Sequence, residues 1–185
     1  MDIDYILEEC RSRLPNTDIL CCYNVGSSLF VQNARDIDIA VVYKGGNYSR
    51  IGFKLSGINA DIKCVREDTF RKIAIGEEIR GITIAFAKDN LLFGELPYKG
   101  YSWNNHKLSV LKSEYDYLTN RFKFLTKDRV CHKWLIYPLS TYYAVFNQSL
   151  NFTDEQKEIL QKCHDGQLPV SYAEELKSNM EKILL

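Results

Sequence analysis

The stretch that decides the fold reads Leu20-Cys21-Cys22-Tyr23-Asn24-Val25-Gly26-Ser27-Ser28 and continues, after a short gap, with Asp36-Ile37-Asp38-Ile39-Ala40-Val41-Val42. The first part is a short apolar run that ends in Gly-Ser. This pattern predicts a buried strand over residues 18–25 that turns sharply at its end. The second part predicts a strand over residues 36–43, which turn residues end at Gly45-Gly46-Asn47.

Alternation along the second strand places two carboxylates on one face. Residues two apart in a strand share a face, so Asp36 and Asp38 point the same way, opposite to Ile37. A divalent cation relieves the repulsion between two such charges, and carboxylate oxygens suit Mg²⁺ or Mn²⁺. The alternative for this Asp-x-Asp pair, taken alone, is a solvated strand face.

A third carboxylate lies on another predicted strand. Residues 50–55 and 58–65 predict a hairpin, and its second strand carries Asp61. If that strand neighbours the one with the Asp-x-Asp pair, three carboxylates meet, which is what a two-metal phosphoryl-transfer site uses. The alternative for Asp61 is an ion pair with Lys63 or Arg50.

Gly26, Ser27 and Ser28 follow the first strand. A strand that passes into a helix start offers backbone N–H groups and a hydroxyl to a phosphate, and Gly26 permits close approach. These three residues are therefore predicted to contact a phosphate group. A helix N-cap is the alternative for Ser27, and the two roles are compatible.

In this order the residues resemble the signature of the nucleotidyltransferase superfamily, which DNA polymerase β and the minimal nucleotidyltransferases of bacteria typify. That signature is an apolar strand, Gly-Ser, a gap, Asp-x-Asp on the next strand and a further Asp on a later one. Here it is matched by Gly26-Ser27, Asp36-Ile37-Asp38 and Asp61. The resemblance covers residues 18–66 directly.

The resemblance implies a role for each matched residue. Gly26 and Ser27 would hold the triphosphate of an incoming nucleotide, and Asp36 and Asp38 would bind the metal that bridges its phosphates. Asp61 would help to bind a second metal and take the proton from an acceptor hydroxyl. All three carboxylates, Asp36, Asp38 and Asp61, are thus expected to be catalytic metal ligands, with Mg²⁺ or Mn²⁺ as the cofactor.

The function that this implies is a metal-dependent transfer of a nucleoside monophosphate from an NTP to a hydroxyl of a protein, an RNA or a small molecule, with release of pyrophosphate. The first alternative is a catalytically idle, antitoxin-like module of the same fold that binds a nucleotide or a protein. The second is a structural interaction domain with an accidental acidic face. Three mutually repelling anions favour the enzyme, because a site released from metal binding has no physical reason to keep them.

The remaining sequence predicts helices on either side of these strands. The fold expected is α+β, with a nucleotidyltransferase-like mixed β-sheet and flanking helices over residues 1–100 and a C-terminal helical bundle over residues 101–185. An irregular connection is expected over residues 89–105. The helices are expected at 3–14, 67–75, 77–88, 107–125, 129–148, 154–164 and 171–184.

Composition narrows the class of protein. The 185 residues are 45% apolar and 26% charged, which excludes a disordered chain. Lys plus Arg and Asp plus Glu both number 24, so strong non-specific binding of nucleic acid is not expected. A local basic excess over residues 106–133 predicts phosphate contacts around Lys123 and Lys127, with a solvated helix surface as the alternative.

The cysteines and the hydropathy indicate a cytoplasmic protein. The six cysteines include no C-x-x-C pair, which favours free buried thiols over zinc or disulfides. No run approaches the roughly 20 apolar residues that cross a bilayer, and the chain starts with an acidic stretch, unlike a secretory signal. No membrane partner is therefore expected.

Overall fold

The computed structural model describes residues 2–48, 50–55, 57–122 and 132–185. The chain divides into two compact units. The first comprises Met1–Leu29, Asn33–Lys72 and Phe86–Tyr101, and the second comprises Phe30–Gln32, Ile73–Ala85 and Ser102–Leu185. A mixed sheet with helices precedes a run of helices, so the predicted α+β class is confirmed.

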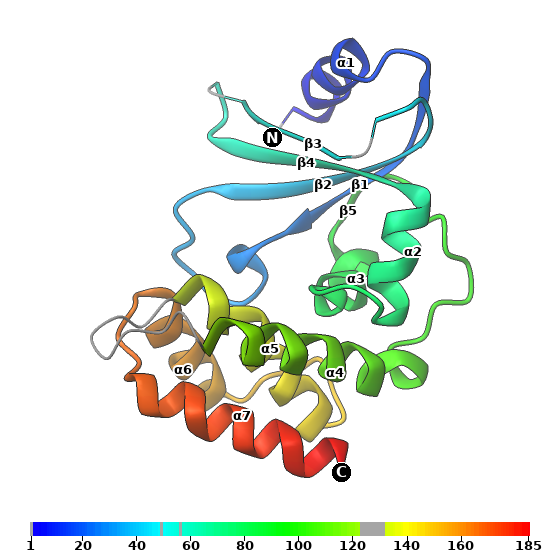
Figure 1. Ribbon diagram of the computed structural model, residues 1–185. Coiled ribbons are helices and arrows are strands. Elements are labelled where there is room, and N and C mark those ends of the chain that lie inside the picture. The colour runs from blue at the N-terminus through cyan, green and yellow to red at the C-terminus, as the bar shows by residue number, and fades with distance from the viewer. Residues whose placement is uncertain (1, 49, 56, 123–131) are drawn as a thin grey trace. The chain divides into compact units, whose positions relative to one another are not determined.

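Five strands form one sheet in the order β3-β4-β2-β1-β5 (Figure 1). Strands β2 and β4 are parallel, and the other neighbouring pairs are antiparallel. The hairpin strand β4 lies directly beside β2, so Asp61 on β4 is on the strand next to the one that carries Asp38, as the predicted site requires. The bounds are β1 Thr17–Val25, β2 Ile37–Gly45, β3 Arg50–Leu55, β4 Ala60–Arg66 and β5 Leu91–Gly94.

Helix α1 (Ile3–Arg13) covers one face of the sheet. It begins at the N-cap Asp2, whose carboxylate accepts a hydrogen bond from the Tyr5 backbone N–H at 3.2 Å. Its apolar side packs on the side chains that alternate to this face of the central strands, so the hydrophobic effect fixes the register of β1, β2 and β4. This core contains Ile6, Leu7, Cys10, Cys22, Ile39, Val41, Tyr43, Ile62 and Cys64.

The other face of the sheet carries Tyr23, which packs edge to face on Phe70 with ring centroids 6.1 Å apart. Phe70 belongs to α2 (Glu67–Ile75), whose bounds match the prediction. The predicted helix over residues 77–88 begins later, as α3 (Gly81–Ala87), and a short 3₁₀ turn, η2 (Lys88–Asn90), follows it. Its delayed start has a backbone cause, because Arg80 has a φ of +73°, which a helix does not accommodate.

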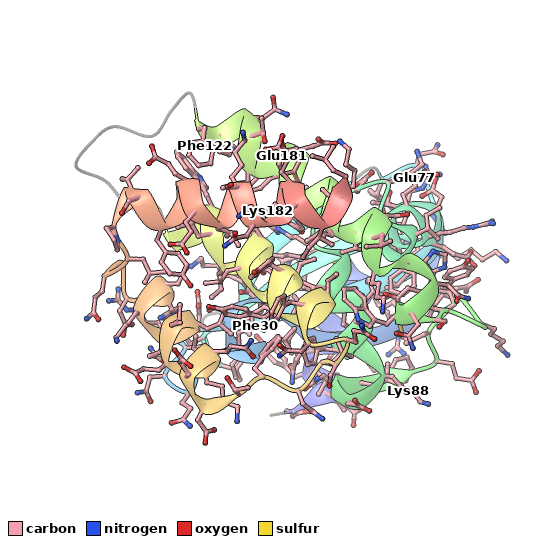
Figure 2. All side chains as sticks on the ribbon, turned by 90° about the horizontal axis from the view of Figure 1, so that it is seen from below. Phe30, Glu77, Lys88, Phe122, Glu181 and Lys182 are labelled. Carbon is pink, nitrogen blue, oxygen red and sulfur yellow. The ribbon has the colours of Figure 1, made fainter. Side chains whose placement is uncertain are left out.

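The second unit contains four long helices: α4 Trp103–Phe122, α5 His132–Phe146, α6 Asp154–His164 and α7 Val170–Leu184. Thr153 caps α6 in a capping box with Gln156, as the sequence predicts. The Tyr115 hydroxyl donates to the Glu181 carboxylate at 3.2 Å and joins α4 to α7 (Figure 2 labels Glu181).

The segment expected to be irregular over residues 89–105 contains strand β5 and the first turn of α4. Strand β5 pairs with β1, with Phe93 opposite Cys22. Four residues are too few to show strand alternation in the sequence, so this strand depends on main-chain hydrogen bonds to β1, a partner distant in the chain.

Two sequence expectations concern the whole chain. The five cysteines that the structure describes are buried and form no disulfide with one another, and Cys131 lies outside the described residues. Within the part of the chain that the structure describes, no helix is both long enough and apolar enough to cross a membrane.

Candidate functional site

The end of β1 presents the Gly-Ser turn. Gly26 has a φ of +87°, a conformation that favours glycine, and its carbonyl accepts a hydrogen bond from the Leu29 N–H at 3.3 Å. Ser27 to Leu29 form a single 3₁₀ turn, η1, instead of the start of a longer helix. Within this turn the Ser28 hydroxyl donates to the Val25 carbonyl at 3.2 Å, while Ser27 is partly exposed.

Gly26 lies directly against Asp38. Val25 and Asp38 are paired in the register of β1 and β2, so the residue after Val25 reaches the carboxylate. A Cβ atom at Gly26 would lie 2.0 Å from Asp38 Oδ2, well inside van der Waals contact. Any larger residue at position 26 would therefore clash with the Asp38 carboxylate.

Asp38 and Asp61 occupy paired positions on the parallel strands β2 and β4. Neighbouring strands lie about 4.8 Å apart, and paired residues of a parallel ladder share a face, so the two side chains are neighbours. Their side chains are 17% and 29% exposed, respectively. The antiparallel β1 and the parallel β4 thus bring the turn at Gly26, Asp38 and Asp61 to one end of the sheet.

Asp36 lies two residues before Asp38, just outside β2, and is partly exposed. The segment around it is held by Asn59, whose side-chain amide donates to the Arg35 carbonyl at 2.9 Å and whose carbonyl accepts from the Ile37 N–H at 3.3 Å. Asn59 has a φ of +47°, which asparagine tolerates better than most residues. Asn59 thus holds the backbone on both sides of Asp36, although it is not part of the sequence motif.

Two lysines balance the paired carboxylates. The Lys63 ammonium forms an ion pair with Asp38 Oδ1, and the Lys54 ammonium lies 3.3 Å from Asp61 Oδ1. An ion pair of Asp61 with Lys63 or Arg50 was the expected alternative. The Lys63 partner is wrong, because Lys63 pairs with Asp38 and Asp61 pairs with Lys54, and the Arg50 side chain lies outside what the structure describes. The reason is the strand register, because β3 places Lys54 directly opposite Asp61.

The carboxylate oxygens of the site are chemically suited to bind a hard divalent cation. Carboxylate oxygens from neighbouring strands are ligands that Mg²⁺ accepts, and Mg²⁺ commonly needs only one or two carboxylates when substrate phosphates supply the rest. Among the described residues, no three His, Cys, Asp or Glu side chains are grouped so that they alone would hold a metal ion. Asp38 and Asp61 therefore form a two-carboxylate pair, and the third predicted ligand, Asp36, comes from the segment just before β2.

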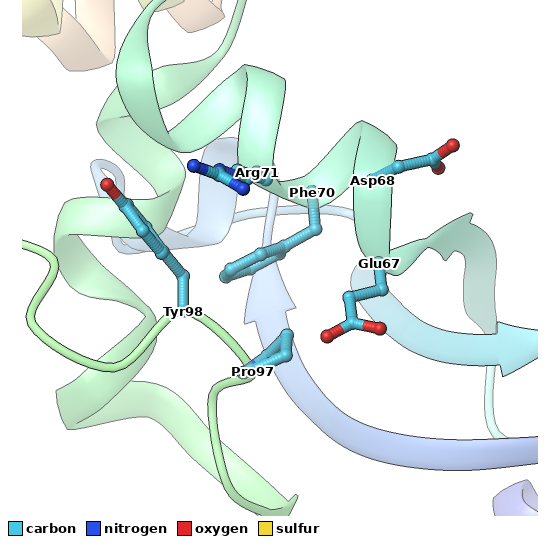
Figure 3. A pocket seen from close by; sticks show the side chains of 6 residues that line it. All are labelled: Glu67, Asp68, Phe70, Arg71, Pro97 and Tyr98. Carbon is cyan, nitrogen blue, oxygen red and sulfur yellow. The ribbon is translucent and has the colours of Figure 1, made fainter.

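A pocket of about 400 Å³ lies elsewhere in the first unit (Figure 3). Phe70 and Tyr98 supply aromatic walls, and the Arg71 guanidinium lies over the Tyr98 ring at 5.7 Å from its centroid. Glu67, Asp68 and Pro97 complete its lining. None of the predicted site residues contributes to this pocket.

The predicted basic contact around Lys123 and Lys127 lies outside the described residues. Nearby on α4, Lys112 forms an ion pair with Asp116, four residues further on, and both side chains are about half exposed. Lys112 is thus part of a solvated helix surface.

Comparisons with solved structures give remote likenesses. The computed model is similar to a solved structure of a nucleotidyltransferase-like protein from Exiguobacterium sibiricum 255-15, with a TM-score of 0.37 and 11% identity. The match covers 99% of this chain and 74% of that one. No family model and no curated protein sequence matches the chain.

Proposed function

We propose that this protein is a metal-dependent nucleotidyltransferase that moves a nucleoside monophosphate from an NTP to a hydroxyl acceptor. The observation that carries the proposal is the pairing of Asp38 with Asp61 on adjacent parallel strands, beside the turn at Gly26. Two half-buried carboxylates and a close-approach glycine at one sheet end make a place where a nucleotide triphosphate and its counter-ion fit.

Each residue has a distinct part in the proposed reaction. Gly26, Ser27 and Ser28 would contact the triphosphate through backbone N–H groups and hydroxyls. Asp36 and Asp38, with Asp61, would hold Mg²⁺ or Mn²⁺, which when bound neutralises charge on the phosphates.

Asp61 would also accept the proton of the acceptor hydroxyl. The acceptor oxygen then forms a bond to the α-phosphorus while the bond from that phosphorus to the bridging oxygen breaks, and pyrophosphate leaves. The chain's main contribution is to position the reacting groups, because phosphoryl transfer asks little covalent chemistry of the protein.

One observation favours the idle, binding-only alternative. Asp38 and Asp61 each have a lysine partner, so the protein neutralises both carboxylates without a metal. A module that only binds a nucleotide or a partner protein would need nothing more from this face.

Two sets of variants test the proposal. The protein is incubated with each α-labelled NTP, Mg²⁺ and a cell lysate, and the labelled product is identified. We expect Asp36→Asn with Asp38→Asn to abolish Mg²⁺-dependent NTP binding in calorimetry, because the double variant removes the charges of two proposed metal ligands. We expect Asp61→Asn to lower turnover by at least about a hundredfold with little change in NTP affinity, because a proton acceptor acts mainly in the transition state.

Asp18→Asn is the matched control, since Asp18 is an exposed carboxylate at the other end of β1. It should match the wild type in binding and transfer. NTP binding without transfer in the wild type, for every nucleotide and lysate tried, would favour the idle module. Unchanged Mg²⁺-dependent NTP affinity in the double variant would contradict the metal assignment.

A further inference from the structure

Four charges of alternating sign cross three neighbouring strands at the candidate site. From β3 to β2 they are Lys54, Asp61, Lys63 and Asp38, and each carboxylate has one ammonium partner. Lys63 follows Asp61 by two residues, so strand alternation gives both side chains the same face. The sum of these formal charges is zero.

Lys63 reaches Asp38 diagonally. Its own register partner on β2 is Ala40, two residues beyond Asp38, so the ammonium folds back along the sheet to the carboxylate. The small side chain of Ala40 leaves this path open.

Asp38 has little freedom to turn away from Lys63. Its Oδ2 atom lies against Gly26, its Oδ1 atom accepts the Lys63 ammonium, and its side chain is only 17% exposed. A cation that approaches Asp38 must therefore displace Lys63 from Oδ1.

We propose that Lys63 is a built-in counter-cation that competes with free divalent metal for Asp38 and passes to a phosphate group when the metal arrives with a polyphosphate. The proposal rests on the proposed function. On this proposal, the site has a low affinity for a bare divalent cation and a higher affinity for a metal–polyphosphate complex.

The physical reason is the exchange of partners. A bare cation that binds Asp38 leaves the Lys63 ammonium without an anion beside a new positive charge, which opposes binding. A polyphosphate supplies that anion. Lysine suits such an exchange because its ammonium is a compact charge on a flexible stem that is not tied to one geometry.

Lys54 competes less strongly with a metal ion for its carboxylate partner, Asp61. Its side chain is 78% exposed, and it lies 3.3 Å from Asp61, so solvent screens the pair. The effect is therefore assigned to Lys63.

The test compares free Mn²⁺ with Mg²⁺–tripolyphosphate as ligands, by calorimetry on the full chain. We expect Lys63→Met to bind free Mn²⁺ about fivefold more tightly than the wild type and Mg²⁺–tripolyphosphate about fivefold more weakly. The two affinities are expected to change in opposite directions. A variant that fails to fold would instead bind both ligands more weakly. Lys63→Arg keeps the positive charge and should resemble the wild type with both ligands.

Lys99→Met is the matched control, because Lys99 pairs with Glu95 on the exposed surface of the same unit. It removes one positive charge and should leave both affinities within about twofold. If Lys63→Met behaves like Lys99→Met while the wild type binds both ligands, the counter-cation role is wrong and the proposed function stands. If neither the wild type nor Lys63→Met binds either ligand, both proposals fail.

Discussion

Gly26 leaves no room for a side chain between the end of β1 and the Asp38 carboxylate. Two independent effects act there: the backbone has a φ of +87°, and a Cβ atom would lie 2.0 Å from Asp38 Oδ2. Either the turn or the carboxylate must move if any other residue takes this position. The glycine thus links backbone conformation to the geometry of the candidate site.

Gly26→Ala should lower the free energy of unfolding by about 2 to 5 kcal/mol, as the sum of a left-handed alanine and an overpacked contact. Gly100→Ala is the matched control. Gly100 has a similar φ of +83° but has no heavy atom within 4 Å of a built Cβ, so only the backbone cost of about 1 kcal/mol applies. Urea unfolding of both variants measures the difference, and equal losses would contradict the steric contact with Asp38.

The carboxylates of the site could be predicted from the sequence, but their lysine partners could not. Strand alternation assigns Asp36 and Asp38 to one face whatever the partner strands are. The Lys54 and Lys63 ion pairs depend on the registers of β3 with β4 and of β4 with β2, which are set by packing between distant segments. For this reason Lys63, predicted as a possible partner of Asp61, pairs with Asp38.

Helix α4 differs from its sequence pattern. Helical spacing predicts one apolar face formed by Leu108, Leu111, Tyr115 and Leu118, yet Leu108 is 52% exposed. The buried residues are Val110, Leu111, Glu114 and Leu118. A charged residue in the core could not be predicted from periodicity, because its burial depends on the turn that precedes α3.

Glu114 is fully buried and holds that turn. Its Oε1 atom accepts a hydrogen bond from the Arg80 backbone N–H at 2.5 Å, and the Arg80 guanidinium lies over the Tyr137 ring. Its Oε2 atom has no hydrogen-bond partner among the described residues. Burial raises the pKa of Glu114 from 4.5 to about 7, although the Arg80 N–H and the Arg80 charge oppose this rise.

Glu114 should therefore make the unfolding free energy depend on pH. The folded protein binds the proton more tightly than the unfolded chain, so stability is fully present below pH 4.5 and falls as the pH rises toward 7. The difference in pKa corresponds to roughly 3 kcal/mol at most. Glu114→Gln keeps an acceptor for the Arg80 N–H and removes the titration, so its advantage over the wild type should grow between pH 5 and 8 in urea unfolding.

Glu174→Gln on α7 is the control, because Glu174 is exposed. Its stability difference from the wild type should stay within about 0.5 kcal/mol at every pH. A Glu114→Gln profile parallel to that of the wild type would show that the buried carboxylate does not titrate in this range.

The chain does not pass once from a sheet unit to a helical unit. Phe30–Gln32 and Ile73–Ala85 come from the first hundred residues but belong to the second unit. Phe30 packs edge to face on Tyr137, with ring centroids 6.1 Å apart. Sequence patterns alone could not predict this division, because both segments carry few residues and are assigned by packing.

The segment Ile73–Ala85 should be needed for the helical unit to fold. A Cβ at Gly81 would lie 2.6 Å from a Val110 methyl, and one at Gly76 would lie 2.4 Å from the Ser109 backbone, so the turn before α3 packs closely on α4.

A fragment of residues 102–185 loses this cover, and Glu114 loses its backbone donor at Arg80. The exposure of Val110 and the apolar surface around it, with the loss of the hydrogen bond between Arg80 and Glu114, costs several kcal/mol, which is a large share of the 5 to 15 kcal/mol of an ordinary domain. We expect fragment 102–185 to show no cooperative thermal transition by circular dichroism and fragment 73–185 to show one. Equal, cooperative melting of the two fragments would mean that the four long helices are sufficient for the unit.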